Sequence, residues 1–351
     1  MKYRIEKRVL HFKQPAGTSR GVYTTRKIWL VLLSDGERQG VGECAPLPDL
    51  SCDALEDERY QSILSKVCEE VCDTGIVNYD YLRDYPSMLF GLETALLNLK
   101  LGDRLFDTSF SRGEEGIPIN GLVWMGNYEE MLRRMEEKLE QGFHCVKLKI
   151  GAIDFDMELD LVKRIRERFS FHEVELRLDA NGAFSMESGA RSQEPEALYK
   201  LELLSQYAIH SIEQPIKAGQ WAYMAQLCRE SPLPIALDEE LIGVNDPEMK
   251  AHMLNIIKPR YIILKPSLHG GMMGCREWIA TAKSQGIGSW ITSALESNVG
   301  LNAIAQFASD VYGDDIRMPQ GLGTGQLFTD NIEMGLEIRG DRLWRKGKVE
   351  G

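Results

Sequence analysis

The segments CVKLKI at 145–150 and VELRLD at 174–179 decide the fold. Side chains alternate between the two faces of a β-strand, so each segment presents apolar side chains on one face and polar, mostly charged ones on the other. If the apolar side chains pack under helices, the charged ones point into the interior of a sheet. Buried charges are costly unless they are paired or bound to a metal. Both segments therefore predict strands that carry a functional site.

The sequence around these segments alternates short apolar runs with helix-like stretches. Strands are predicted near residues 117–123, 144–150, 174–179, 210–213, 234–238, 260–265, 288–293 and 316–319. Helical periodicity is clear at 127–141, 154–169, 194–206 and 271–285. Eight strands with crossover helices predict an α/β fold in which a parallel sheet closes into a TIM-like (β/α) barrel, here over residues 117–324.

The N-terminal part has a different pattern. Residues 2–13 and 22–34 read as strands, and residues 53–72 and 87–101 have helical periodicity. Strands followed by helices, without alternation, predict a separate α+β unit over residues 1–110. The polar, glycine-containing stretch 107–116 is typical of a linker. The tail at 325–351 is expected to return to this N-terminal unit and complete it.

Charge and cysteine content exclude several classes of protein. The net charge of −12 is the opposite of what binding to nucleic acid or to an anionic membrane surface requires. The charged and apolar alternation of MKYRIEKRVLHF leads us to expect no secretory signal, and the apolar runs are too short to span a bilayer. Seven scattered cysteines without a CxxC pair support neither a zinc ribbon nor a disulfide framework. We expect a cytoplasmic protein.

Ionisable residues recur at the carboxyl ends of five consecutive predicted strands, where barrel enzymes place their active sites. Asp179, Glu213 and Asp238 end three neighbouring strands. They are hard oxygen donors without accompanying histidine or cysteine, which suits Mg²⁺, with Mn²⁺ as a possible substitute. The sequence therefore predicts that the three carboxylates converge on one divalent cation.

Lysines Lys147, Lys149 and Lys265 complete this set. An ammonium group beside a divalent cation and another lysine should have a lowered pKa, which would allow the neutral amine to take a proton from carbon. A metal can bind a substrate carboxylate and stabilise the enediolate that forms when the α-proton leaves. The predicted substrate is thus a small carboxylate, with lysines on opposite sides of it.

These residues lie in motifs that resemble the enolase superfamily, in its muconate-cycloisomerase-like branch. The matching motifs are KLK at 147–149, RLDANG at 177–182, IEQP at 212–215, LDE at 237–239 and LKP at 264–266. The segments GVGECAPLP and GLETALLNLKLGD look like that family's capping domain and its junction with the barrel. The resemblance covers nearly the whole chain, and it implies a barrel with an α+β capping domain.

Within that branch, GECAPLPDLS and SWITSALESNVGL most resemble the o-succinylbenzoate synthase family, the magnesium-dependent dehydratases of menaquinone synthesis. The resemblance implies that Lys149 is the base and that its conjugate acid assists loss of hydroxide. Lys265 would stabilise the enediolate, and Lys147 would tune Lys149 and hold the carboxylate.

The resemblance also assigns roles to the acidic and polar residues. Asp179, Glu213 and Asp238 would hold the magnesium, with Asn181 and Glu239 in the layer around them. Ser293 would lie near the ring or the succinyl portion of the substrate. Asn181 and Arg177 are further candidates for substrate contact. The loop at 14–25 would cover the site and help to select the substrate.

Other functions remain open on the sequence alone. N-succinylamino acid racemases share all of these catalytic groups. Dipeptide epimerases typically carry an Asp-x-Asp pair at the eighth strand, and RMPQGLGTGQLF at 317–328 has none. A catalytically silent barrel that serves as a binding or scaffold module would lack a ligand or a lysine, and none is missing.

Single residues also have plainer interpretations. Arg177 and Glu175 could form only an ion pair inside the barrel. Ser293 could cap a helix. His269, in the loop after Lys265, is expected to be a solvent-exposed loop histidine.

Overall fold

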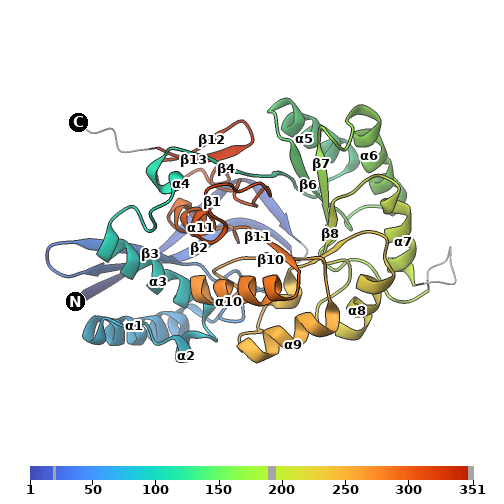
Figure 1. The fold of residues 1–351 in the computed structure, drawn as a ribbon. Coiled ribbons are helices and arrows are strands. Elements are labelled where there is room, and N and C mark those ends of the chain that lie inside the picture. Colours follow the sequence, from blue (N-terminus) through green and yellow to red (C-terminus); the bar gives the residue numbers. More distant parts are fainter. Residues whose placement is uncertain (19–20, 189–194, 347–351) are drawn as a thin grey trace.

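The computed structural model describes residues 1–18, 21–188 and 195–346. Within them, strands form a three-stranded antiparallel sheet, a seven-stranded parallel sheet and a small sheet near the C-terminus. Figure 1 shows the parallel sheet curled, with helices on its outside and the antiparallel sheet to one side. The N-terminal sheet domain and the α/β region are therefore separate layers, as the change in sequence pattern predicted.

The N-terminal domain packs helices on one face of an antiparallel sheet. Its elements are β1 (Lys2–Thr18), β2 (Gly21–Ser34), β3 (Gln39–Cys44), α1 (Asp57–Thr74), α2 (Tyr79–Leu82) and α3 (Pro86–Leu101). The backbones of α3 and β3 are in direct contact. A Cβ atom added to Gly42 in β3 would lie only 1.8 Å from the carbonyl oxygen of Gly91 in α3. Two glycines thus allow the backbones of a strand and a helix to meet.

The parallel sheet has its strands in chain order, which is the arrangement that crossover helices produce. The strands are β5 (Gly121–Val123), β6 (Cys145–Lys149), β7 (Glu175–Asp179), β8 (Ser211–Glu213), β9 (Ile235–Leu237), β10 (Tyr261–Leu264) and β11 (Gly288–Ile291). The helices are α5 (Tyr128–Glu140), α6 (Phe155–Arg168), α7 (Glu196–Ser205), α8 (Trp221–Glu230), α9 (Pro247–Ile257), α10 (Gly271–Ser284) and α11 (Asn298–Tyr312).

Alternation along β6 places its side chains as the sequence predicted. Val146, Leu148 and Ile150 are buried in the main hydrophobic core together with residues of the outer helices. Lys147 and Lys149 therefore point to the opposite, inner face of the curled sheet. The apolar layer under the helices holds the strand in register, because a shift by one residue would bury both lysines in that core.

The eighth strand predicted near 316–319 is wrong. Arg317 is exposed and pairs with Asp315 at 2.8 Å, and Pro319 has no backbone N–H to donate to a neighbouring strand. The extended contacts begin one residue later. Gln320 bridges Ile119 just before β5, and Gly321 bridges Thr292 just after β11, both in parallel orientation. This segment therefore contacts the chain next to both edge strands of the seven-stranded sheet, β5 and β11.

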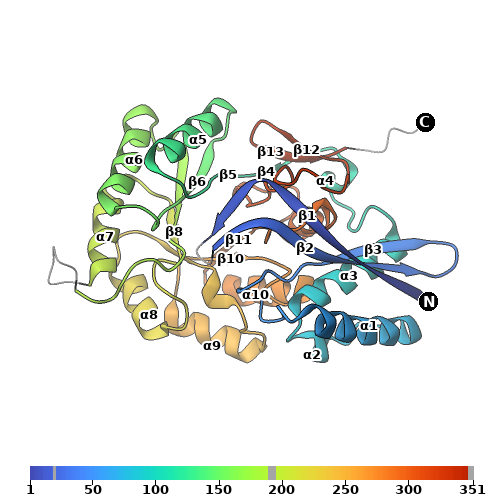
Figure 2. The same ribbon diagram turned by 180° about the vertical axis from the view of Figure 1, so that it is seen from behind.

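The predicted linker contains a short helix, α4 (Ser109–Arg112), and Phe110 in it is buried. The tail forms β12 (Leu336–Arg339) and β13 (Arg342–Arg345), and β13 pairs with β4 (Ile117–Pro118). Figure 2 shows this small sheet near β1. Before β12 in the chain, the carbonyl of Leu327 accepts the backbone N–H of Lys13 in β1 at 2.8 Å. Residues 347–351 of the predicted tail lie outside the described residues.

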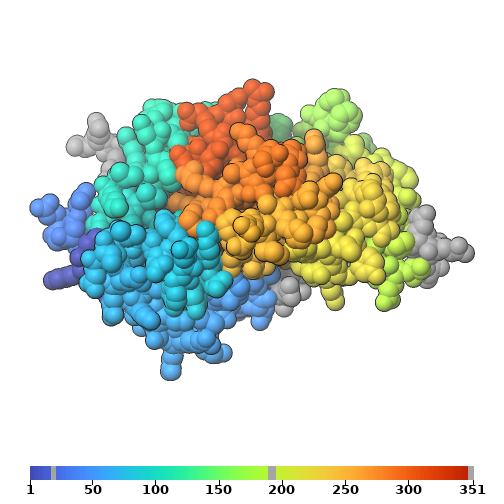
Figure 3. Space-filling view, turned by 60° about the horizontal axis from the view of Figure 1, so that its bottom comes forward, coloured from blue at the N-terminus to red at the C-terminus, as the bar shows by residue number. Residues whose placement is uncertain are grey.

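The N-terminal helices lie against the α/β region on one face of the molecule, where Figure 3 shows the blue and cyan part of the chain directly beside the orange part. At this boundary the carboxylate of Glu93 in α3 accepts the backbone N–H groups of Met272 and Met273 in α10. No helix in the described part of the chain is long and apolar enough to cross a membrane.

Candidate active site

A cavity of about 840 Å³, counting the open space at its mouth, lies at the carboxyl ends of the parallel strands. It gathers all but one of the site residues that the sequence predicted: Lys147, Lys149, Asp179, Asn181, Glu213, Asp238, Glu239, Lys265 and Ser293. Tyr23, Leu47 and Leu50 of the N-terminal domain form part of its wall. The cavity therefore lies between the inner face of the sheet and the N-terminal domain.

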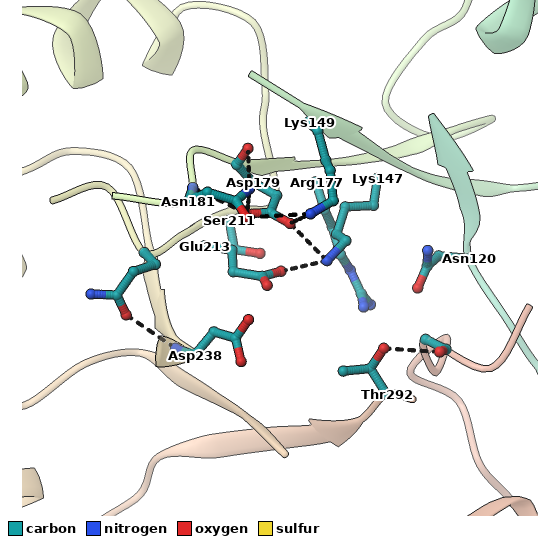
Figure 4. Close-up of polar contacts among 12 residues, drawn as sticks. Asn120, Lys147, Lys149, Arg177, Asp179, Asn181, Ser211, Glu213, Asp238 and Thr292 are labelled. Atoms are coloured by element: carbon teal, nitrogen blue, oxygen red, sulfur yellow. Dashed lines mark hydrogen bonds and ion pairs between the residues drawn. The ribbon is translucent and has the colours of Figure 1, made fainter. Parts of the chain in front are cut away.

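Strand register brings the first charged residues together. On neighbouring strands, Lys149 is level with Asp179, and Asp179 is level with Glu213. The Nζ atom of Lys147 is 3.0 Å from Oδ2 of Asp179 and 2.8 Å from Oε2 of Glu213. Figure 4 shows this amine between the two carboxylates.

Asn181 connects Lys149, the predicted base, to Asp179, the first of the predicted metal ligands. Its backbone φ of 47° lies in the left-handed region, which asparagine tolerates better than most residues. This conformation turns the side chain back, so that Nδ2 donates to Oδ1 of Asp179 and Oδ1 accepts a hydrogen bond from Lys149 at 3.3 Å. The Nζ atom of Lys149 also lies 3.2 Å from Asp179 and over the ring of Trp124.

The third predicted lysine, Lys265, lies on the other side of the cavity from Lys147 and Lys149. Lys265 directly follows β10, four strands from β6 in the sheet order, and its amine forms an ion pair with Asp238 at the end of β9. Oδ1 of Asp238 and Oε2 of Glu239 are buried and have no hydrogen-bond partner in the described part of the chain. These two oxygens are available to a cation or a substrate.

Mutual proximity shifts the ionisation of these groups. Burial raises the pKa of Glu213, and the nearby charge of Asp179 raises it further. Burial alone would raise the pKa of Asp179, but Lys147 and Lys149 hold it below its usual value. Burial alone would lower the pKa of Lys265, but Asp238 and Glu213 raise it above its ordinary value. Lys265 is therefore kept as an ammonium group.

The pKa of Lys147 moves in the direction opposite to the prediction. Burial lowers it, but the charges of Asp179 and Glu213 outweigh burial and raise it. The prediction assumed a divalent cation beside the lysine, whereas here the two carboxylates act on the amine directly. Their attraction therefore decides the direction.

The predicted metal ligands do not converge on one point. Within residues 1–18, 21–188 and 195–346, no group of three or more His, Cys, Asp or Glu side chains is arranged to hold a metal ion. Asp179 and Glu213 instead contact Lys147, and Asp238 contacts Lys265. The donor chemistry still fits Mg²⁺, because three hard oxygen donors end adjacent strands and one oxygen of Asp238 is buried without a partner.

The predictions for Ser293 and Arg177 have different outcomes. Ser293 lines the cavity and shares a hydrogen bond of 2.6 Å with Thr324, and the helix that follows is capped by Ser297, so Ser293 is not a helix cap. Arg177 does not line the cavity. Its guanidinium contacts Glu175, the carbonyl of Pro319 and the ring of Trp290, which is the ion-pair alternative.

The expectation that His269 is exposed is wrong. Its side chain is 1% exposed, and its Nδ1 accepts the backbone N–H of Lys265 at 2.9 Å. The loop after β10 folds back, and this hydrogen bond fixes the backbone that carries Lys265. Tertiary packing, not loop position, decides its burial.

Gln214 is a residue whose role the sequence did not indicate. Its backbone φ is 41°, and its Oε1 accepts the N–H groups of Asp238 and Glu240. It therefore fixes the turn that carries one predicted metal ligand. The IEQP motif contained this glutamine but did not show which backbone it would hold. The predicted loop at 14–25 consists of the ends of β1 and β2, apart from residues 19 and 20, which lie outside the described residues.

Comparison with known proteins agrees with the motifs at the strand ends. Residues 130–331 match the family of enolase C-terminal domain-like proteins, and residues 18–99 match the MenC N-terminal domain. The chain is 45% identical to the o-succinylbenzoate synthase of Desulfotalea psychrophila, over 95% of this chain and 96% of that protein. The chain belongs to the o-succinylbenzoate synthase family of the enolase superfamily. The predicted resemblance is confirmed.

The fold agrees with this membership. The crystal structure of MenC from Desulfotalea psychrophila superposes with a TM-score of 0.81 at 41% identity, covering 98% of this chain and 99% of that one. The N-succinylamino acid racemase of Thermus thermophilus is more distant, at 29% identity over 81% of this chain and 75% of that protein. Members of the superfamily generally depend on a divalent metal.

Proposed function

We propose that this chain is a carbon–oxygen lyase that dehydrates 2-succinyl-6-hydroxy-2,4-cyclohexadiene-1-carboxylate to o-succinylbenzoate, in menaquinone biosynthesis. The observation that carries the proposal is the pair of lysine sets on opposite sides of one cavity, Lys147 and Lys149 on β6 and Lys265 after β10. The 45% identity to an o-succinylbenzoate synthase over nearly the whole chain supports the choice of substrate.

The chemistry follows from the positions of the lysines. Lys149 takes the proton from the carbon that bears the carboxylate, and the electrons of that C–H bond pass to the carboxylate as an enediolate. The same ammonium group then donates its proton to the neighbouring hydroxyl. The C–O bond breaks, water leaves, and the ring becomes aromatic.

The other two lysines supply charge. Lys265 is an ammonium group, and it stabilises the developing negative charge from the side opposite Lys149. Lys147 forms ion pairs with both Asp179 and Glu213 and adds a positive charge close to Lys149. Asn181 orients Lys149 through the hydrogen bond from Nζ.

Asp179, Glu213 and Asp238 are the residues that would hold Mg²⁺ or Mn²⁺, with Asn181 and Glu239 next to them. When bound, the metal would supply a Lewis acid for the substrate carboxylate. The unpartnered oxygen of Asp238 supports this assignment.

Polar groups opposite the lysines are proposed to bind the rest of the substrate. Ser293 and Thr324 share a hydrogen bond in the cavity wall, and their hydroxyl groups can turn toward the succinyl portion or the ring. The proposed partner is thus a small carboxylate alone, without nucleic acid or membrane. Seven free cysteines support a proposed cytoplasmic location, because all are described and none is in a disulfide.

We also propose that the parallel sheet is a closed barrel. The bridges from Gln320 to Ile119 and from Gly321 to Thr292 support closure, because they connect the two ends of the sheet. The proposed domains are a capping domain of residues 1–110, completed by 325–351, and a barrel of residues 117–324. Pairing of Phe12 with Phe328 supports the return of the tail.

The test is the dehydration of the cyclohexadiene carboxylate by Lys149→Ala, with and without Mg²⁺. The variant should lose activity while keeping the circular dichroism spectrum of the native protein. Turnover at a near-native rate would show that Lys149 is not the base. Racemisation of N-succinyl amino acids is the second candidate function, favoured by the similarity to the Thermus thermophilus racemase. Deuterium exchange at their α-carbon as fast as dehydration would support it.

A further inference from the structure

The guanidinium group of Arg26 is buried between the N-terminal domain and the α/β region. Arg26 lies on β2 and is 2% exposed. Its five N–H groups match five hydrogen bonds, and every acceptor is a neutral backbone carbonyl. The side chain contacts neither a catalytic lysine nor a predicted metal ligand. The function proposed above therefore gives it no role.

The carbonyl groups that Arg26 holds come from two loops of different domains. In the loop after β3, Nη2 donates to Ala45 at 2.6 Å and Nη1 donates to Pro46 at 2.5 Å. In the loop after β11, Nε donates to Leu295 at 3.1 Å and Nη2 donates to Ala294 at 3.3 Å. Arg26 is thus a direct connection between the two loops.

Both loops form the wall of the active-site cavity. Leu47 lines it from the first loop, and Ala294 and Leu295 line it from the second, directly after Ser293. Leu295 has a backbone φ of 64°, a conformation that a residue with a branched side chain adopts only when its surroundings impose it. The hydrogen bond from Arg26 to the carbonyl of Leu295 is one such constraint.

Two buried carboxylates complete the surroundings of Arg26. Glu43 on β3 accepts the backbone N–H groups of Ser297 and Gly300 at the start of α11. Glu296 accepts the backbone N–H of Ala294 at 2.6 Å. Burial lowers the pKa of Arg26, and the charges of Glu296 and Glu43 raise it and partly offset the effect of burial. The carboxylates of Glu296 and Glu43 therefore hold N–H groups of the second loop and of the start of α11, while Arg26 holds the carbonyl groups of Ala294 and Leu295.

We propose that Arg26 is a positioning residue that holds the Leu47 and Leu295 walls of the cavity together and thereby sets the affinity for the apolar part of the substrate. This inference rests on the proposed function only in the identity of that substrate. The lysines and the proposed metal ligands lie on β6, β7 and β8 and directly after β9 and β10. Arg26 does not touch these residues. Its loss should therefore weaken binding more than it slows the chemical step.

Arg26→Lys is the first test variant, because lysine keeps the charge but has three donors that cannot span both loops. Arg26→Met, which removes all donors, is the second. We expect the KM for the cyclohexadiene carboxylate to rise about tenfold in Arg26→Lys, the equivalent of about one hydrogen bond from a charged group, and to rise further in Arg26→Met. The kcat value should change by less than about threefold, since the lysines keep their positions.

Arg166→Lys is a matched control. Arg166 on α6 also donates to backbone carbonyls, those of Val174, Tyr207 and Ala208, and Ala208 is likewise in the left-handed region. None of these residues lines the active-site cavity. Arg166→Lys should therefore leave KM unchanged. A fall in kcat at unchanged KM in Arg26→Lys, or no change in either, would overturn the inference.

Backbone hydrogen–deuterium exchange separates this inference from the proposed function. Amides of residues 45–51 and 293–297 should exchange faster in Arg26→Lys than in the wild type, but not in Arg166→Lys. Binding of the probe o-succinylbenzoate to the magnesium-loaded protein should weaken in parallel. If the wild type does not dehydrate the substrate, the proposed function fails, and the exchange result alone decides on Arg26. If neither variant folds, wild-type amides at 294–296 that exchange as fast as the exposed turn at 35–37 would contradict the inference.

Discussion

The Nζ atom of Lys149 donates to Oδ1 of Asn181 at 3.3 Å. The same asparagine donates from Nδ2 to Asp179, so one side chain orients both the proposed base and a proposed metal ligand. Its left-handed backbone makes this possible, because the residue two positions after Asp179 turns back over the end of β7. Geometry at the site therefore depends on a residue with no acid–base role of its own.

Asn181→Gly should lower activity by about 10- to 100-fold, the usual effect of removing a group that orients metal ligands. Glycine suits the left-handed backbone, so the substitution removes the side chain without adding strain. Steady-state kinetics across a magnesium titration would measure the loss. Asn98→Gly is the control, since Asn98 holds the backbone of Val41 outside the site. Equal activity of Asn181→Gly and wild type would contradict the assignment.

Lys265→Met should lower kcat by about 10²- to 10³-fold, because the enediolate would lose a preorganised positive charge. Lys250→Met is the matched control. Lys250 is also a buried lysine in an ion pair, with Glu277 at 2.7 Å, but it lies away from the cavity. The control should unfold at a lower temperature and keep the kcat of its folded fraction. If both variants lost kcat equally, the role of Lys265 would be structural.

Chelation should abolish activity, and added Mg²⁺ or Mn²⁺ should restore it. A cation that binds only the folded state also stabilises it, by about 2.7 kcal/mol at a hundredfold excess over its dissociation constant. Thermal unfolding with and without Mg²⁺ would measure this effect. Asp238→Asn should abolish the shift, whereas Asp53→Asn, at a buried carboxylate of the N-terminal domain, should retain it. A full magnesium shift in Asp238→Asn would refute its role as a ligand.

The stability of the fold should fall between about pH 4.5 and pH 8 through Glu93. Burial at the domain boundary raises the pKa of Glu93 from 4.5 to about 8 in the folded protein. The folded state therefore holds a proton that the unfolded chain releases as pH rises through this range, and the resulting loss is on the order of a few kcal/mol.

Glu93→Gln should remove this loss, because the amide does not titrate, although its single oxygen replaces only one of the two carboxylate oxygens that accept the N–H groups of Met272 and Met273. Urea unfolding at several pH values would measure the slope. Glu58→Gln, at an exposed position, should leave the wild-type slope. A wild-type slope in Glu93→Gln would show that another group is responsible.

The two-residue alternation in CVKLKI and VELRLD was sufficient to predict which side chains face inward. Apolar side chains of β6 leave water together, so only one register buries them and turns both lysines to the other face. The same periodicity failed for the eighth strand, because Pro319 lacks a backbone donor and the bridges begin at Gln320. Alternation also turned Arg177 inward, but its guanidinium lies over the ring of Trp290 and does not line the cavity.

Sequence alone determined the nature and order of the charged residues, because strand periodicity and the parallel sheet place the end of each strand at one edge. Tertiary structure decided the rest: the burial of His269, the hold of Gln214 on Asp238, and the contact of Arg26 with two loops. These contacts join residues far apart in the chain. A local sequence pattern does not predict these contacts, because they depend on how the loops of two domains pack together.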